Sequence, residues 1–203
     1  MSILYNLAYA IGFTPWERAA TADPTTLPRL LTAEEAHRGG PGRALDLGCG
    51  SGAQLAMLAA RGWKATGVDL VPKALARARR RLAAQGLTAD LVRTDATELP
   101  PAAVGSGYDL FLDIGCYHGL HPAARARMGR AVTALAAPDA SVLILAFQAG
   151  ALPRPMPRGA DQADIQAAFP GWTLTDTEPA ITDGMPRPLR KAAPHWYRLH
   201  RND

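Results

Sequence analysis

The sequence predicts an α/β protein built on one doubly wound sheet, and three observations lead to this fold. Short apolar runs typical of buried strands alternate with helical patterns along most of the chain. A turn with three glycines joins the first of these strands to the helix that follows it. The run SVLILAF at Ser141–Phe147 is apolar throughout, as expected of a strand that is buried on both faces.

Residues 1–40 precede the first strand and have a helical pattern. Apolar residues recur at helical spacing from Ile3 to Ile11, and Gly12 suits the end of that helix. A second helix is expected at Leu27–His37, before the breaker Gly-Gly-Pro-Gly at residues 39–42. On this pattern alone, the segment could simply pack on the sheet.

The first strand, Ala44–Leu47, is followed by Gly48, Gly50 and Gly52 and then by a helix at Ala53–Arg61. One glycine would be enough for a tight turn. Three glycines in five residues let a ligand lie against bare backbone, where free N–H groups and a helix N-terminus meet. We therefore expect a ligand at this loop.

The alternation continues to the end of the chain. Pro72 suits the first turn of the second core helix and Gly86 suits its end. Proline-rich loops at 148–159 and 179–194 interrupt the later elements. Seven strands and no internal repeat predict a single domain over residues 1–203, with its core at 41–203. The further strands are Lys64–Leu70, Ala89–Arg93, Tyr108–Ile114, Ser141–Phe147, Trp172–Thr177 and His195–His200, and the further helices are Pro72–Gln85, Pro122–Leu135 and Asp161–Phe169.

Composition narrows the classes of function. The chain has 203 residues, 48% hydrophobic and 20% charged, which is typical of a globular domain. A net charge of +4 is too small to indicate nucleic-acid binding by itself. No apolar run is long enough to span a membrane. Cys49 and Cys116 lie in predicted loops; they could pair, but reduced thiols in a cytoplasmic protein are the simpler reading.

Four acids, Asp46, Asp69, Asp95 and Asp113, fall at or just after the ends of predicted strands. Ligands of open α/β sheets bind outside the carboxyl ends of the strands, so these acids suit a cationic ligand rich in hydroxyl groups. A dinucleotide is an alternative, because Gly48-x-Gly50-x-x-Ala53 fits the loose dinucleotide fingerprint. A dinucleotide also carries ribose hydroxyls, and Asp69 would accept hydrogen bonds from them.

The pattern acid-x-Gly-x-Gly-x-Gly at residues 46–52 resembles motif I of the class I S-adenosylmethionine-dependent methyltransferases. Similar segments follow in the family's order: GVDL at 67–70, TDATELP at 94–100 and YDLFLD at 108–113. The resemblance implies a Rossmann-like, mostly parallel seven-stranded sheet with an antiparallel last strand. It also implies that residues 1–40 form a helical lid, in which Tyr9, Phe13 and Trp16 offer aromatic walls for a substrate.

The resemblance further implies how S-adenosylmethionine would be bound and S-adenosylhomocysteine left as product. Asp69 would take the ribose hydroxyls, and Asp46 would face the ammonium, directly or through water. Asp95 would accept from the adenine amine, although each of these acids could instead cap a loop or start a turn. The complete predicted set is Asp46, Gly48, Cys49, Gly50, Gly52, Asp69, Leu70, Asp95, Ala96, Asp113 and Ile114.

Methyl transfer depends mainly on in-line positioning, and a base is needed only if the nucleophile is protonated. The candidates follow the fourth strand: His118 is the natural base, with Tyr117 and His121 beside it. Tyr117 and His118 are also expected to contact the acceptor. The alternative is that the histidines are loop residues bonded to backbone. No metal is expected.

The same loop bears on the substrate. DNA and protein amide-nitrogen methyltransferases carry an Asn/Asp-Pro-Pro-aromatic motif after this strand, whereas here the chain reads DIGCY at 113–117. DIGCYHGL and the terminal HWYRLHR resemble the small bacterial branch of tellurite-resistance, thiol and heterocycle methyltransferases. We therefore expect a small aromatic or thiol acceptor and no nucleic acid. A nicotinamide-dependent oxidoreductase and a non-catalytic S-adenosylmethionine-binding protein are the alternatives, and the sequence fixes neither the acceptor atom nor the oligomeric state.

Overall fold

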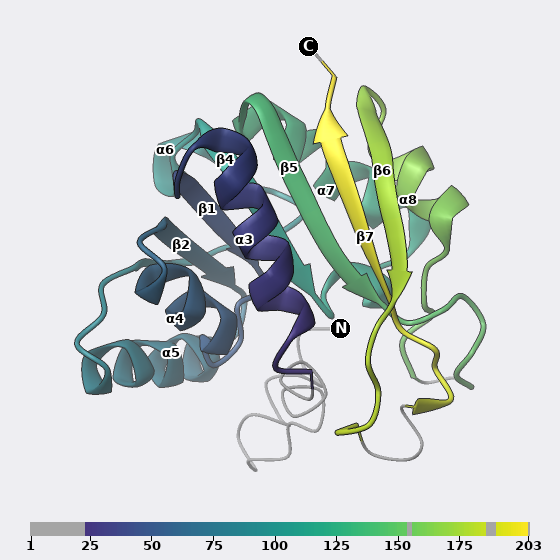
Figure 1. Cartoon of the computed structure of the whole chain (residues 1–203), viewed down its shortest axis with the longest axis horizontal. Coiled ribbons are helices and arrows are strands. Elements are labelled where there is room, and N and C mark those ends of the chain that lie inside the picture. The colour runs from purple at the N-terminus through teal and green to yellow at the C-terminus, as the bar shows by residue number, and fades with distance from the viewer. Residues whose placement is uncertain (1–22, 154–155, 186–189, 203) are drawn as a thin grey trace.

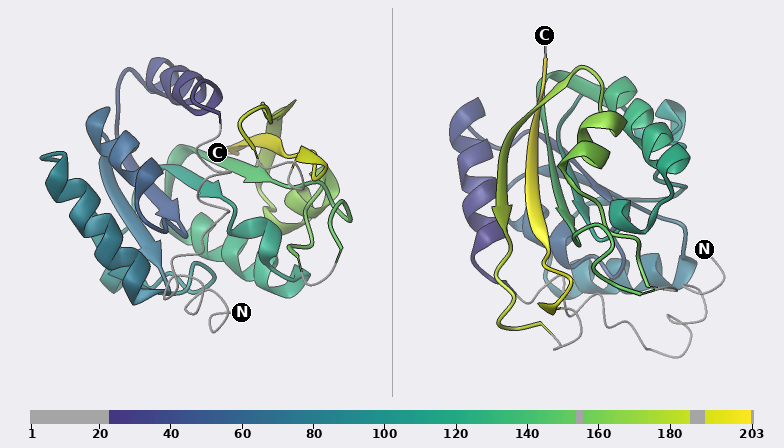
Figure 2. Two further views of the ribbon diagram at one scale, coloured as in Figure 1. Left: turned by 90° about the horizontal axis from the view of Figure 1, so that it is seen from below. Right: turned by 90° about the vertical axis from the view of Figure 1, so that its right-hand side faces the viewer.

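The structure is a computed structural model that describes residues 23–153, 156–185 and 190–202. Within these residues, one seven-stranded sheet has the strand order β3-β2-β1-β4-β5-β7-β6. Helices cover both faces of the sheet (Figures 1 and 2). The predicted doubly wound α/β fold is therefore confirmed.

The observed elements follow the predicted order, with small differences at their ends. The strands are β1 Arg43–Leu47, β2 Lys64–Asp69, β3 Asp90–Arg93, β4 Tyr108–Ile114, β5 Ala136–Ala146, β6 Trp172–Pro179 and β7 His195–Arg201. The helices are α3 Thr26–Arg38, α4 Ala53–Ala60, α5 Pro72–Ala84, α6 Pro101–Val104, α7 Pro122–Leu135 and α8 Gln162–Ala168, with a single 3-10 turn, η1, at Tyr117–Gly119. The sequence did not predict α6 and η1, which are too short to show a period.

Strand directions decide where a site can form. β1 pairs in parallel with β2 and β4, and the pairs β2–β3 and β4–β5 are also parallel. β7 is antiparallel to both of its neighbours, β5 and β6. The antiparallel last strand is thus confirmed. The carboxyl ends of β1 to β5 all open at one edge of the sheet, beside the glycine loop.

The two faces of the sheet carry separate hydrophobic cores. On one face, leucines of α3 and α4 pack against Leu110 and Leu143 of the sheet. On the other face, residues of α7 and α8 pack around Phe111 and Val142. Successive strand residues point to opposite faces, so central strands must be apolar on both sides. This requirement explains the unbroken apolar run in β5.

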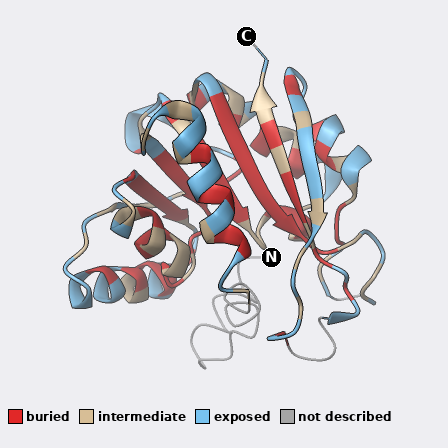
Figure 3. Ribbon diagram, in the orientation of Figure 1, coloured by how far each residue is buried: buried red, intermediate tan, exposed pale blue. Residues whose placement is uncertain are grey.

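Helix α3 corrects one expectation. Leu27, Leu30 and Leu31 are buried in the core of one sheet face, so α3 is part of the helical layer and not a lid. Buried and exposed residues alternate along α3 in Figure 3, as in any helix with one face against a core. The expected lid is therefore wrong for residues 26–38. The rest of that expectation, with Tyr9, Phe13 and Trp16, lies outside the described residues.

None of the described helices combines the length and the apolar character needed to cross a bilayer.

Candidate functional site

A cavity of about 460 Å³ lies at the carboxyl edge of the parallel strands. Its wall is built from the loops that follow β1, β2, β3 and β4, from the first turn of α4 and from the first two turns of α7. Most of the predicted cofactor residues are in it. The lining residues are Gly48, Cys49, Gly50, Ser51, Ala53, Gln54, Val68, Asp69, Leu70, Val71, Thr94, Asp95, Ala96, Thr97, Ile114, Gly115, Cys116, Gly119, Leu120, His121, Ala124 and Arg127.

The glycine loop has the backbone that its sequence requires. Gly48, Gly50 and Gly52 have φ values of 74°, 52° and 77°, in the left-handed region that side chains disfavour. A Cβ on Gly48 would lie 2.9 Å from the Cβ of Cys116, so no side chain fits between the loop and the end of β4. Gly48 and Gly50 line the cavity, as predicted.

Gly52 was predicted to bind the cofactor, but its position indicates a structural role. Gly52 is absent from the cavity lining and is the N-cap of α4. A Cβ at this position would lie 2.8 Å from the Cβ of Ala78 in α5. The glycine therefore allows α4 and α5 to approach closely, which supports the loop from behind.

Asp69 joins the end of β2 to the glycine loop. One carboxylate oxygen accepts a hydrogen bond from the Gly50 N–H at 3.0 Å, and the other accepts from the Val71 N–H at 2.7 Å. Two backbone donors thus fix the orientation of this carboxylate in the cavity wall. Leu70, next to it, also lines the cavity and is exposed there.

Asp95 and Ala96 line the cavity after β3. The Asp95 carboxylate accepts a hydrogen bond from the Thr97 N–H at 2.8 Å, which makes the tight turn proposed as its alternative role. The two roles are compatible, because the turn holds both residues in the wall. The Thr97 hydroxyl, in the same turn, is buried without a hydrogen-bond partner.

Asp113 is fully buried at the end of β4 and does not line the cavity, whereas Ile114 does. The Asp113 carboxylate accepts hydrogen bonds from the N–H groups of Cys116 and Tyr117 at 3.0–3.1 Å. Burial raises the pKa of Asp113 to about 7, and those backbone hydrogen bonds oppose the rise. Asp113 therefore holds the loop after β4, and its buried position does not support the predicted contact with the cofactor.

Asp46 is buried behind the glycine loop and does not line the cavity. Burial, and then the negative charges of Asp113 and Asp69, raise the pKa of Asp46 to about 8. One of its carboxylate oxygens is buried without a hydrogen-bond partner. A backbone hydrogen bond from Leu55 opposes the rise in pKa, and a positive charge bound nearby would oppose it as well.

Tyr117 and His118, two of the predicted catalytic residues, are buried outside the cavity wall. The Tyr117 hydroxyl donates to the Asp164 carbonyl at 2.8 Å. The His118 Nδ1 accepts from the Phe147 N–H at 3.2 Å, and its ring stacks on that of Phe147 at 4.4 Å. Burial, and then the charge of Arg125, lower the pKa of His118 to about 4. This is the geometry of a loop residue bonded to backbone, the alternative raised above, and not that of a group facing an acceptor.

His121 is the predicted catalytic residue that does reach the cavity. It lines the wall and caps α7, where its side chain accepts from the Ala124 N–H. Arg127, one turn later on α7, also lines the wall, and its Nε is buried without a hydrogen-bond partner. The sequence analysis did not single out Arg127; its spacing of three from Ala124 places the two residues on one helix face.

Cys49 and Cys116 both line the cavity as free thiols. Burial, followed by nearby carboxylates, raises the pKa of both thiols well above its ordinary value. The thiolate is the reactive form of cysteine, so neither side chain is set up as a nucleophile.

Comparisons with known proteins agree on the type of domain. Residues 44–139 match the family model described as a methyltransferase domain. A curated relative, the 2-heptyl-1-hydroxyquinolin-4(1H)-one methyltransferase of Mycobacteroides abscessus, is 30% identical over 146 residues. That match covers 68% of this chain and 62% of the relative, so the chain spans less than two thirds of that protein's length.

Two solved structures resemble the chain over almost its whole length. One, from work on the conversion of a disulfide bond into a thioacetal group during echinomycin biosynthesis, has a TM-score of 0.77 and 23% identity, and the match covers 100% of this chain and 93% of that one. The other is the 1,6-didemethyltoxoflavin-N1-methyltransferase of Burkholderia thailandensis, with bound 1,6-didemethyltoxoflavin and S-adenosylhomocysteine. Its TM-score is 0.70 and its identity 24%, with coverage of 98% and 86%. At these identities, the likeness establishes the fold.

Proposed function

We propose that this chain, whose residues 44–139 match the model of a methyltransferase domain, transfers the methyl group of S-adenosylmethionine to a small-molecule acceptor. The observation that carries the proposal is the Gly50–Asp69 contact in the cavity wall. It joins a backbone that can lie against a ligand to a carboxylate that can accept hydrogen bonds from a ribose.

The residues of the cavity divide into groups that fit different parts of the methyl donor. Asp69 would bind the ribose hydroxyls, and the turn at Asp95 and Ala96 would bind the adenine. The glycine loop would lie along the methionine end, with Asp46 behind it. Buried carboxylates near a bound cation stabilise it more strongly than they would in water. S-adenosylmethionine, whose sulfonium and ammonium are both positive, suits this distribution of charge.

The proposed reaction asks little of the protein beyond orientation. The donor supplies an activated methyl group, and holding the acceptor in line with it can contribute about 7–11 kcal/mol. At the α7 end of the cavity wall, the His121 side chain could take a proton from an acceptor. His118 is a poor candidate, because it is buried, bonded to backbone and has a lowered pKa.

Two observations support a class of acceptor: the side chains at the α7 end of the cavity, and the acceptors of two similar methyltransferases. Leu120, Ala124 and Ile114 give that region an apolar wall, and Arg127 adds a positive charge. The named acceptors of the curated relative and of the toxoflavin enzyme are both small heterocycles. We therefore propose a small aromatic or thiol-containing acceptor, methylated at nitrogen, oxygen or sulfur, and not a nucleic acid. The two free thiols support a cytoplasmic location.

Two measurements test this function. In a thermal-shift comparison, S-adenosylhomocysteine should raise the melting temperature of the protein and NADH should not. The protein should then transfer label from methyl-labelled S-adenosylmethionine to at least one member of a panel of thiols, phenols and N-heterocycles. Stabilisation by NADH alone would favour an oxidoreductase. Donor binding without turnover on any member of the panel would favour a non-catalytic binding protein.

A further inference from the structure

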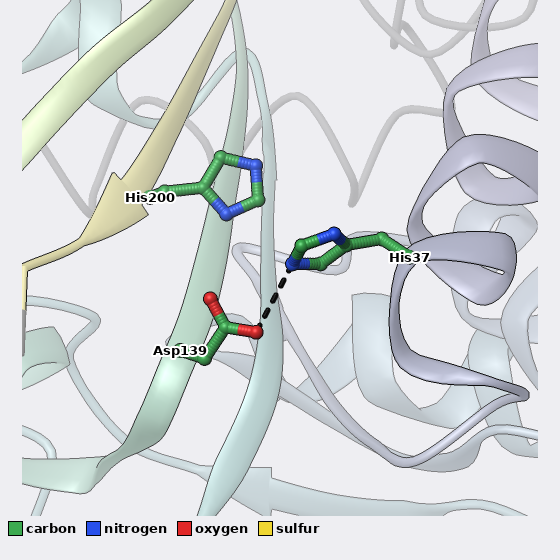
Figure 4. A group of neighbouring side chains, drawn as sticks. All are labelled: His37, Asp139 and His200. Carbon is green, nitrogen blue, oxygen red and sulfur yellow. Dashed lines mark hydrogen bonds and ion pairs between the residues drawn. The ribbon is translucent and has the colours of Figure 1, made fainter.

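A second group of chemically active side chains lies at the edge of the sheet opposite to the cavity. His37 from the last turn of α3, Asp139 from β5 and His200 from β7 place one ligand atom each within 4.8 Å of one another. Figure 4 shows the two imidazole rings and the carboxylate gathered in the space between the end of α3 and the sheet. These residues are far apart in the chain, and none of them takes part in the proposed methyl transfer.

Two contacts already join His37 to the other members. The His37 Nε2 lies 3.0 Å from a carboxylate oxygen of Asp139, and the His37 and His200 rings meet edge to face at 5.3 Å between centroids. In a tetrahedral zinc site, bond lengths of about 2.0–2.2 Å put neighbouring ligand atoms about 3.4 Å apart. The His37 and Asp139 side chains are both largely exposed, so small rotations can bring the atoms to that spacing.

The surroundings of His200 fix which of its nitrogens carries the proton. Ser141, its cross-strand partner, donates its hydroxyl proton to the buried carboxylate of Glu34 at 2.6 Å. The Ser141 oxygen lies 3.3 Å from the His200 Nδ1. A hydroxyl has a single proton, so this oxygen accepts a hydrogen bond from the Nδ1–H of His200 while no metal is bound. Figure 4 shows Nδ1, the nitrogen next to the side-chain attachment, on the side of the ring that faces His37 and Asp139. A metal bound there would displace the proton from Nδ1, because a histidine binds a metal through an unprotonated nitrogen.

The charges around the cluster also suit a cation. Glu34 is held by Arg198 at 2.6 Å, so its charge is largely balanced, whereas the Asp139 carboxylate is paired with His37, which carries a charge only when it is protonated. Asp139 has a φ of 56°, an uncommon backbone for a residue other than glycine, and its side chain nevertheless extends toward the two rings.

From this geometry, we propose that His37, Asp139 and His200 form a binding site for one divalent transition-metal ion, with Zn²⁺ as its simplest occupant. Two imidazoles and one carboxylate are typical ligands for zinc, cobalt, nickel and copper and not for magnesium or calcium. A metal there would join the end of α3 to β5 and β7, the three elements that contribute the ligands. Because the ligands are partly exposed, water would complete the coordination.

The experiment uses the full chain without a histidine tag, stripped of metal with a chelator and then dialysed. Calorimetric titration with ZnCl₂ should give one site, and Zn²⁺ at about 100 times its dissociation constant should raise the melting temperature by roughly 5–10 °C. MgCl₂ should give neither effect. Co²⁺ should show the visible absorption bands that arise from imidazole and carboxylate coordination.

Variants locate the site. His37→Ala and His200→Ala should each weaken Zn²⁺ binding at least tenfold, and Asp139→Asn should weaken it as well. His195→Ala is the matched control, because His195 is a histidine at the other end of the same strand, β7, and it should bind Zn²⁺ as the wild type does. Circular dichroism and S-adenosylhomocysteine binding report whether each variant is folded.

No Zn²⁺ binding by the wild type would overturn the proposal. Binding that survives in the folded variants His37→Ala and His200→Ala would overturn it too, as would an equal loss in His195→Ala. If His200→Ala fails to fold, the His37→Ala and Asp139→Asn results decide, because both side chains are largely exposed.

Discussion

Asp46→Asn should stabilise the ligand-free protein and weaken its binding of the methyl donor. Asp46 is a buried acid with a carboxylate oxygen that has no hydrogen-bond partner. Burial and the neighbouring Asp113 and Asp69 raise its pKa to about 8, from 3.8. The folded protein therefore holds a proton on Asp46 that the unfolded chain releases at much lower pH.

The sign follows from this difference in pKa. Below about pH 4, Asp46 is protonated in both the folded and the unfolded protein, so its raised pKa does not change the free energy of unfolding. As the pH rises from about 4 to 8, the unfolded chain loses the proton first, so the folded state becomes less stable, by up to about 1.4 kcal/mol per pH unit. Asparagine has the shape of the protonated acid and never ionises, so position 46 of the variant should not lower the stability of the folded state as the pH rises.

The magnitude can be bounded. A pKa displaced from 3.8 to about 8 sets an upper limit of about 6 kcal/mol, at about 1.4 kcal/mol per unit. Single substitutions usually change stability by 0.5–3 kcal/mol, so we expect a gain of about 1–3 kcal/mol at pH 8. For a chain of this size, this corresponds to a rise of roughly 3–9 °C in melting temperature, and the gain should shrink as the pH falls toward 4.

The donor should respond in the opposite direction. A bound cation lowers the pKa of Asp46, so binding releases a proton and wild-type affinity should increase with pH up to about 8. Asp46→Asn should reduce affinity for S-adenosylmethionine about tenfold, within the range for a lost interaction with a charged group, and should flatten this pH dependence.

Melting curves and calorimetric titrations at pH 5, 6, 7 and 8 measure both effects. Asp90→Asn, an Asp-to-Asn change at an exposed position in β3, is the control and should change neither. A stability difference between Asp46→Asn and wild type that does not vary with pH would refute the argument from burial. Unchanged affinity with a flat wild-type pH profile would show that Asp46 does not respond to the donor's charge.

Three further predictions concern the rest of the site. Asp69→Ala should lower affinity for S-adenosylhomocysteine about tenfold to a hundredfold, as a lost charged hydrogen bond does, and normal calorimetric binding would reject its role. Gly50→Val should abolish donor binding, because a β-branched residue resists a φ of 52° next to the ligand; a folded variant that binds normally would show that the loop is only a turn. His118→Ala should lower the melting temperature, because it removes a ring stacked on Phe147 and leaves the Phe147 N–H without its acceptor. Across acceptors of graded pKa, a rate loss in His118→Ala confined to the protonated acceptors would contradict this and restore it as a base.

Local features of the sequence were enough to predict the sheet and the glycine loop that lines the cavity. Alternating patterns determine which segments become strands and helices, and the strands and longer helices of the described residues were predicted to within a few residues, apart from an early start for β5 at Ala136. The short elements α6 and η1 were not predicted. The three loop glycines specify their own backbone, because only glycine adopts a positive φ without strain. Asp69 was predictable for a similar reason, since it directly follows a buried strand and the carboxyl ends of parallel strands meet at one edge.

Packing between distant elements decided the rest. Whether α3 covers the sheet or the cavity depends on where its leucines find a core, and the helical period alone does not say which surface it meets. His118 and His121 are three residues apart, yet one is buried against Phe147 and the other lines the cavity. His37, Asp139 and His200 have no spacing that resembles a metal motif, and they meet because the ends of α3 and β7 and the start of β5 lie at the same edge of the sheet. Periodicity and backbone preference are properties of neighbours in the chain, whereas burial and side-chain clusters arise only when remote segments pack together.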